Sequence, residues 1–314
     1  MKLRKILAAV LGCTMLLATG CSSTATTSSS SAASSSSTAS SSSTASSSSS
    51  VASSASSSEA ASSEAESTAE LTGTVSLSGS TSMEEVVKAL AEDFMNKNPG
   101  VTIDAQFNGS GQGITDATEG KADIGNSSRE LKEEELAGGL TANVIAIGGI
   151  AVVVNPANPV NDLTIQQLAD IYTGTIKNWS EVGGEDKPIV VVGRDAASGT
   201  RSAFEEILGV SDACAYAQEK DSTGAVKTAV EPTPEAIGYV SLEAADADEN
   251  TKKLMLDGAE ATAENIVSGS YKLSRPFIMA TKGELRPEVQ AFLDYVLSEE
   301  GQAVVASQSL ITVG

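Results

Sequence analysis

The chain has 314 residues, of which 41 are acidic and 20 basic, and it contains no histidine. Its formal net charge of −21 argues against binding to nucleic acid or to anionic membrane surfaces, because both would be repelled. Without histidine, a Ser-His-Asp or Cys-His catalytic arrangement is impossible.

The first 20 residues are predicted to be a lipoprotein signal peptide. Three basic residues precede an apolar run over 6–19, which is too short to cross a bilayer comfortably. The run ends in LLATGC, the pattern of a lipobox with Cys21 as the lipidated residue, whereas Cys13 would leave too short an apolar run. We therefore expect a lipid anchor at Cys21 that tethers the chain to a membrane. An ordinary secretory signal with an incidental cysteine is the alternative.

Residues 21–70 are predicted to form a disordered linker behind the anchor. After Cys21 they are almost entirely serine, alanine and threonine, which cannot bury a core. A flexible linker of about 50 residues has an average reach of roughly 40 Å. It would hold a folded domain at the outer face of the cell membrane, within a cell wall of the Gram-positive type.

Residues 71–314 are expected to fold with a sizeable core. Three basic and four acidic residues precede this part, which therefore carries a net charge of about −20. Of the three cysteines only Cys214 lies here, so we expect neither an intrachain disulfide nor a zinc site. Cys214 is interpreted as a small, semi-buried apolar residue.

Strands and helices alternate along this part, which predicts an α/β fold. A strand over 74–80 runs into a helix with apolar residues at helical spacing, which Pro99-Gly100 ends. A second strand over 101–108 leads to GSGQG and a short helix. ADIGNSSRELKEEEL and PIVVVGRDAASGTRSAF repeat the order of strand, hydroxyl-rich turn and helix.

Four strand-to-helix junctions carry hydroxyl residues and glycine: Ser80-Thr81-Ser82, Gly109-Ser110-Gly111, Ser127-Ser128 and Ser198-Gly199-Thr200. Helix N-capping alone explains any one of them. Together they predict more, because such junctions meet at the carboxyl ends of the strands, where open α/β sheets bind ligands. Helix N-termini there offer unpaired N–H groups, and Arg194 and Arg201 add positive charge. The pattern predicts a site for a small multivalent oxyanion.

Several motifs occur in a fixed order: LSGSTSM, NGSGQGI, ADIGNSSRELKEEE, IYTGTIKNWSEVGG, GRDAASGTRSAF and PEAIGYVSL. This set resembles the phosphate-binding lipoproteins of phosphate ABC transporters, the PstS-type members of the periplasmic-binding-protein superfamily. The resemblance covers essentially all of 71–314. It implies a monomeric, extracytoplasmic solute-binding lipoprotein that captures inorganic phosphate and delivers it to an ABC permease, with no cofactor or metal.

The resemblance also implies a two-lobed fold of type II, in which each lobe is a mixed sheet flanked by helices. Two crossover strands would connect the lobes, near 150–155 and 274–281. The first lobe would comprise 71–153 and 273–314, and the second 154–272. Trp179 is expected to pack within a lobe rather than to contact the ligand.

By their positions in the motifs, the phosphate-binding residues would be Thr81, Ser82, Ser110, Ser128, Arg194, Ser198, Gly199 and Thr200. Ser80, Arg129 and Arg201 are further candidates. Arg201 could instead pair with Glu205 one helical turn away, and Arg129 could be a solvated helix residue. Asp195 could orient Arg194 or lie exposed.

One departure from the family pattern concerns ligand selectivity. The best-known members have a carboxylate at the position of Ser128, where it accepts the proton of phosphate and repels sulfate. A hydroxyl accepts a hydrogen bond but does not repel a dianion. Glu84, Asp123 or a backbone carbonyl could supply the acceptor. A binding protein for sulfate, molybdate or arsenate is therefore the alternative function.

A surface scaffold and an enzyme are the remaining classes. A scaffold would use the linker for display, but it does not need four hydroxyl-rich turns. Ser110 lacks the glycine of a G-x-S-x-G nucleophile elbow, and no G-x-x-x-x-G-K-[ST] phosphate loop is present. The protein is therefore not expected to be an enzyme.

Overall fold

The computed structural model describes residues 71–314. The predicted signal peptide, the lipid anchor at Cys21 and the linker over 21–70 lie outside the described residues. No helix within 71–314 is long and apolar enough to cross a membrane.

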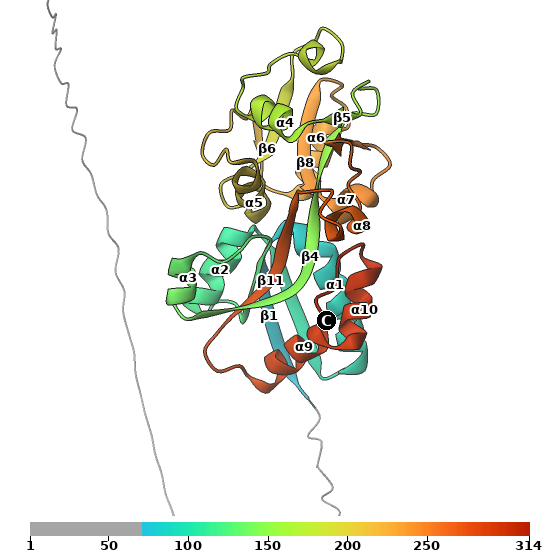
Figure 1. Cartoon of the computed structure of the whole chain (residues 1–314). Coiled ribbons are helices and arrows are strands. Elements are labelled where there is room, and N and C mark those ends of the chain that lie inside the picture. Colours follow the sequence, from blue (N-terminus) through green and yellow to red (C-terminus); the bar gives the residue numbers. More distant parts are fainter. Residues whose placement is uncertain (1–70) are drawn as a thin grey trace, which may run out of the picture. The chain divides into compact units, whose positions relative to one another are not determined.

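One mixed, nine-stranded sheet organises the described part of the chain, in the order β2-β1-β3-β11-β4-β8-β6-β7, with β9 paired to β4 (Figure 1). Its strands are β1 (Gly73–Gly79), β2 (Val101–Phe107), β3 (Ile124–Ser127), β4 (Leu140–Val154), β6 (Val190–Arg194), β7 (Gln218–Lys220), β8 (Ala236–Ser241), β9 (Lys252–Lys253) and β11 (Ser274–Lys282). β5 (Asp162–Leu163) and β10 (Met255–Leu256) pair separately. The α/β fold class is confirmed.

Ten α-helices and two 3-10 helices accompany the strands within 71–314. They are α1 (Glu84–Lys97), α2 (Ser110–Glu119), α3 (Glu133–Ala137), α4 (Ile165–Tyr172), α5 (Gly199–Leu208), α6 (Thr223–Val230), α7 (Leu242–Asp246), α8 (Ala263–Val267), α9 (Pro287–Leu297) and α10 (Glu299–Ser307), with η1 (Thr81–Met83) and η2 (Trp179–Val182). α1 and α9 pack on the half of the sheet that contains β1, and α6 packs on β6 and β8.

One long strand, β4, runs through both halves of the sheet, with β11 beside its first part (Figure 1). They are antiparallel, from the pair Ser274–Gly149 to the pair Lys282–Leu140. The last five residues of β4 also pair with β8. A strand of 15 residues is long for a globular protein, where about five or six is usual. Its length makes the two halves one continuous sheet.

The buried side chains form two large core clusters, and we name the two lobes after them. The first lobe comprises 71–146 and 277–314, and the second comprises 150–273. On β4 the packing changes from the first core to the second between Ala146 and Ile150, and at the start of β11 it changes back between Leu273, just before the strand, and Phe277. The crossovers are thus 147–149 and 274–276. The first crossover lies a few residues before the predicted segment 150–155, which packs in the second core.

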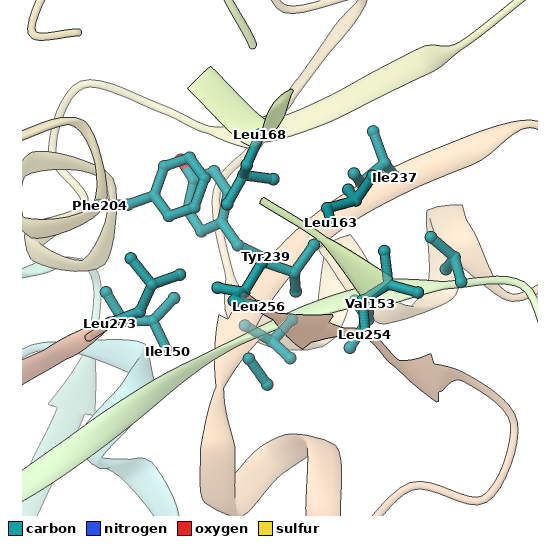
Figure 2. Packing of buried hydrophobic residues seen from close by; sticks show 14 of the residues in the cluster. Ile150, Val153, Leu163, Leu168, Phe204, Ile237, Tyr239, Leu254, Leu256 and Leu273 are labelled. Carbon is teal, nitrogen blue, oxygen red and sulfur yellow. The ribbon is translucent and has the colours of Figure 1, made fainter. Parts of the chain in front are cut away.

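The second-lobe core surrounds the end of β4 (Figure 2). Ile150 and Val153 from β4 and Ile237 and Tyr239 from β8 are all buried in this core. Full burial of a large apolar side chain stabilises a fold by about 1.5–3 kcal/mol. Trp179 also packs in this core, and its indole N–H donates to Glu235 O at 2.9 Å.

Candidate functional site

The first lobe brings five buried hydroxyl side chains to one edge of its sheet: Ser80, Thr81, Ser82, Ser110 and Ser128. β1 lies between β2 and β3 and is parallel to both, so the carboxyl ends of all three strands meet there. Ser80 Oγ donates to Ser128 Oγ at 2.9 Å, and Ser110 Oγ lies 3.3 Å from Ser128 Oγ. Ser80 also caps η1, since its Oγ accepts from Ser82 N–H. Capping therefore accounts for only part of the hydroxyl contacts at this edge.

The second lobe contributes the end of β6 and the start of α5. Ser198 caps α5, because its Oγ accepts from Arg201 N–H at 3.2 Å. Gly199 and Thr200 are the first two residues of the helix, and Thr200 is 1% exposed. Arg194, the last residue of β6, is 2% exposed. A complete guanidinium group is thus buried at the strand end that precedes the helix.

Hydrogen bonds between hydroxyl groups connect the two lobes. Ser82 Oγ lies 2.7 Å from Thr200 Oγ1 and 3.2 Å from Thr223 Oγ1. Thr81 Oγ1 lies 3.3 Å from Thr223 Oγ1, and Ser128 Oγ lies 3.3 Å from Thr200 Oγ1. We define the hydroxyl cluster as Ser80, Thr81, Ser82, Ser110, Ser128, Thr200 and Thr223. The structure thus brings together side chains from five separate segments of the chain.

The backbones of the two lobes also come close at this cluster. Gly111 N–H donates to Ala197 O at 3.0 Å. A Cβ atom at Gly199 would lie 2.3 Å from Ser110 Oγ and 3.0 Å from Ser128 Oγ. Since real Cβ atoms essentially never come within 3.0 Å of another heavy atom in this way, only glycine fits at position 199 in this closed arrangement.

Arg194 carries the positive charge of the site. Its Nε, Nη2 and Nη1 donate to Lys220 O at 3.2 Å, Asp221 O at 3.0 Å and Thr223 Oγ1 at 3.3 Å. These acceptors are neutral, and Arg194 forms no ion pair with any carboxylate of 71–314. Burial lowers the pKa of the guanidinium below its ordinary value, although a guanidinium stays protonated at neutral pH. A buried cation with only neutral partners attracts an anion.

The other two candidate arginines are paired with carboxylates. Arg129 binds Glu135 through two hydrogen bonds of 2.9 and 2.7 Å, and it is buried rather than solvated. Arg201 donates to Glu205 at 2.8 Å and to Glu219 at 2.9 Å. The pairing with Glu205, which the sequence offered as the alternative role of Arg201, is therefore present. Neither arginine donates to the hydroxyl cluster.

The proposed carboxylate acceptors lie elsewhere in the described part of the chain. Glu84 pairs with Lys88 on the exposed face of α1, and Asp123 binds Ser76 and Arg286. Asp195 has one buried carboxyl oxygen without a hydrogen-bond partner within 71–314. The hydrogen bonds of the cluster hydroxyls run to other hydroxyls, to backbone and to Arg194.

The junction after β3 differs from the prediction. A helix was expected directly after Ser127-Ser128, but α3 begins only at Glu133. The reason is local, since the Glu135 carboxylate accepts from Lys132 N–H and also holds Arg129. Ser128 therefore reaches the cluster from the end of a strand and not from a helix N-terminus.

Sequence reasoning missed Thr223, which makes three hydrogen bonds with other residues of the cluster and accepts a fourth from Arg194. It is the first residue of α6 and follows β7, a strand of three residues with the sequence QEK. Because this strand has no apolar run, it could not be recognised as a strand. The signal that remained was KDSTGAV, which has the same hydroxyl and glycine composition as the other junctions.

The chain is similar to proteins of known family. The model of the PBP superfamily domain matches residues 24–300. The phosphate-binding protein PstS of Bacillus subtilis is 37% identical over 235 residues, which is 74% of this chain and 78% of the relative. PstS of Borreliella burgdorferi is 30% identical and covers 70% of this chain and 82% of its own length.

Solved structures show the same similarity. A putative phosphate ABC transporter substrate-binding protein from Clostridium perfringens, solved with bound phosphate, is 46% identical with a TM-score of 0.75. It covers 77% of this chain and 100% of its own. An ABC-type phosphate transport receptor from Vibrio cholerae is 35% identical with a TM-score of 0.65, and covers 77% and 100%.

These matches confirm the resemblance and the absence of an enzymatic role, because the relatives are substrate-binding proteins. The chain therefore belongs to the PstS-type phosphate-binding proteins of the periplasmic-binding-protein (PBP) superfamily.

Proposed function

We propose that this protein binds inorganic phosphate between its two lobes, outside the cytoplasm, and delivers it to an ABC permease. The observation that carries the proposal is Arg194, a buried cation at the edge of the hydroxyl cluster that has no carboxylate partner among residues 71–314. Of its five N–H groups, three are used by neutral acceptors, which leaves two for a phosphate oxygen.

The hydroxyl cluster would supply most of the remaining donors. In the proposed complex, Thr81, Ser82, Ser110, Ser128 and Thr200 donate to the anion instead of to one another. A hydrogen bond to a charged group contributes about 1.5–3 kcal/mol, against about 0.5–1.5 kcal/mol for a neutral pair. Several such exchanges provide the roughly 8 kcal/mol that a micromolar site needs.

The N-terminal turn of α5 would complete the site. Ser198 and Gly199 lie at its start, where free N–H groups and the helix dipole favour negative charge. Since the anion replaces hydroxyl bonds that cross from one lobe to the other, it would hold the lobes closed, with 147–149 and 274–276 as hinges. Ser80, which caps η1, would support this edge from behind.

Anchoring and delivery form the second part of the proposal. A relative from Bacillus subtilis is named phosphate-binding protein PstS, and we propose that this chain is an extracytoplasmic phosphate-binding protein. A lipid on Cys21 and the linker over 21–70 would tether it to the membrane as a monomer, within reach of permease subunits. Replacement of Cys21 by serine should release the protein into the medium, and retention in the membrane fraction would contradict the anchor.

The first test of function is isothermal titration of the purified protein, stripped of anion, with phosphate and then with sulfate. We expect micromolar or tighter phosphate binding. Phosphate heat without sulfate heat would mean that a group other than the Ser128 hydroxyl provides selectivity. Equal heats from both anions would favour the alternative of a broader oxyanion-binding protein.

The second test removes the buried cation. Arg194→Ala should weaken phosphate binding by at least about 100-fold, since the loss of a charge-assisted pair exceeds 2.7 kcal/mol. The control is Arg286→Ala, which removes an arginine bound to Asp123 and Glu288 and outside the hydroxyl cluster. Unchanged affinity in Arg194→Ala would contradict the proposed site.

A further inference from the structure

The turn after β7 encloses the guanidinium of Arg194. Lys220 O and Asp221 O accept from Nε and Nη2, and the Thr223 hydroxyl accepts from Nη1. Strand β7 pairs in parallel with β6, so the residue opposite Arg194 is Lys220. This register places the start of α6 beside the arginine at the same edge of the sheet as the start of α5.

Thr223 has its donor proton directed at the first lobe. A hydroxyl group has one proton and two lone pairs. The Thr223 oxygen accepts from Arg194 Nη1 at 3.3 Å, and its other neighbours, Ser82 Oγ at 3.2 Å and Thr81 Oγ1 at 3.3 Å, belong to the first lobe. With one lone pair taken by Arg194, the proton and the second lone pair of Thr223 both face these two side chains, and the bond donated by the cation polarises the hydroxyl.

The local fold does not need this hydroxyl. Ser222 already caps α6, because its Oγ accepts from Ala225 N–H at 3.2 Å. Val226 and Val230 attach the helix to the second-lobe core. The Thr223 side chain is 5% exposed, and the hydroxyl contacts that it makes outside its own segment are with Arg194, Thr81 and Ser82.

We propose that Thr223 is a further anion-contacting residue of this site, one that donates to the bound phosphate and fixes Arg194 at the same time. The proposal rests on the proposed phosphate-binding function. In the complex, the proton that points to Thr81 and Ser82 turns to a phosphate oxygen, while the oxygen keeps its bond to Nη1. α6 thus provides a second contact from the second lobe, beside α5.

The test compares Thr223→Val, which keeps the shape and removes the hydroxyl, with Thr223→Ser, which keeps the hydroxyl. Phosphate affinity and dissociation rate are measured on the whole purified protein. We expect Thr223→Val to weaken binding by about 10- to 100-fold, mainly through faster dissociation, and Thr223→Ser to stay within about threefold of wild type. Thr223→Ala removes the same hydroxyl and replaces the valine variant should that one fail to fold.

The matched control is Thr228→Val in the same helix, at an exposed position where the hydroxyl bonds only to Gly224 O. It should bind phosphate as wild type does. If wild type binds phosphate and Thr223→Val binds it within twofold of wild type, the role of Thr223 is refuted while the proposed function stands. If wild type itself binds no phosphate, both proposals fail.

Discussion

At the scale of single residues, the close contact between the two lobes depends on the absence of a side chain at Gly199. Gly199 belongs to the second lobe, and the atoms that a Cβ would meet, Ser110 Oγ at 2.3 Å and Ser128 Oγ at 3.0 Å, belong to the first. Gly199 is the first residue of α5, where its backbone is helical and accepts alanine without strain. A methyl group there would disturb closure and leave the second lobe itself intact.

We therefore predict that Gly199→Ala weakens phosphate binding by at least about tenfold and does not lower the free energy of unfolding without phosphate. Alanine is even favoured over glycine in helices by up to about 1 kcal/mol. Titration calorimetry and urea unfolding measure the two effects. Gly224→Ala in the first turn of α6 is the control, because no atom lies within 4 Å of the added Cβ and binding should not change. A Gly199→Ala protein with wild-type affinity would show that the lobes close differently.

Much of the site could be predicted from residue types, but the roles of charged residues could not. Hydroxyl groups at strand ends follow from local sequence, since each junction carries its own signal. Whether an arginine is free or paired depends on a partner that only the fold brings near. Arg201 finds Glu205 one turn away and Glu219 on β7, while Arg194 finds only neutral acceptors. The sequence offered Glu205 as a partner for Arg201 but did not reveal Glu219, which only the pairing of β7 with β6 brings near.

At the scale of elements, a chain of hydrogen bonds connects β6 to α5 behind the site. Arg194 N–H donates to Tyr239 Oη at 3.2 Å, and Tyr216 Oη donates to the Glu205 carboxylate at 2.8 Å. The two phenol oxygens are 3.3 Å apart. Since the Tyr216 proton goes to Glu205, Tyr239 must donate to Tyr216. The hydrogen bonds thus all run in one direction, from Arg194 N–H on β6 to the carboxylate of Glu205 on α5. That carboxylate also forms an ion pair with Arg201.

We predict that Tyr239→Phe lowers the free energy of unfolding by about 1–3 kcal/mol, because it leaves the buried Arg194 N–H without an acceptor. Tyr172→Phe is the matched control in the same aromatic cluster. The Tyr172 hydroxyl is buried and has no hydrogen-bond partner within 71–314, so its removal should be neutral or stabilising. Urea unfolding of both variants decides the matter, and equal destabilisation would mean that the hydrogen-bond chain contributes nothing.

The sequence indicated most elements with long apolar runs but not the shortest ones. α1, β2 and β6 follow from periodicity, whereas β7 is polar and is a strand only because β6 lies beside it. The late start of α3 depends on Glu135, whose side chain binds both Arg129 and the backbone of Lys132. Propensity rules do not contain such tertiary contacts.

At the scale of the whole molecule, two ionisable side chains, Arg275 and Glu243, are buried near the segments that connect the lobes. Arg275, at the start of β11, donates to Gly149 O on β4, while its Nε and Nη2 have no partner within 71–314. Glu243, at the start of α7, has no hydrogen-bond partner for either carboxyl oxygen in the described part of the chain. Nothing in the sequence indicated that these two side chains, which are distant along the chain, would be buried.

Burial raises the pKa of Glu243 from 4.5 to about 7, an effect that Asp246 increases and that the positive charge of Arg275 partly offsets. The sign of the effect on stability follows from the unfolded chain, where Glu243 loses its proton near pH 4.5. Below that pH both states are protonated and the group has no effect. Between pH 4.5 and 7 the free energy of unfolding falls as the pH rises, because the unfolded chain releases a proton that the folded chain keeps. Above pH 7 the loss of stability is complete, on the order of 3 kcal/mol.

We therefore predict that Glu243→Gln stabilises the protein at pH 8 by up to that amount and has little effect at pH 4.5. The measurement is urea unfolding at a series of pH values in phosphate-free buffer, with the fluorescence of Trp179 as the probe. Glu249→Gln, at an exposed position just beyond the same helix, is the control and should run parallel to wild type. If the free energy of unfolding of Glu243→Gln changes with pH in parallel with that of wild type, the Glu243 carboxyl is not held protonated in the folded chain. If the unfolding free energies of Glu243→Gln and wild type agree at low pH and separate as the pH rises, the buried carboxyl destabilises the folded chain by an amount that grows with pH.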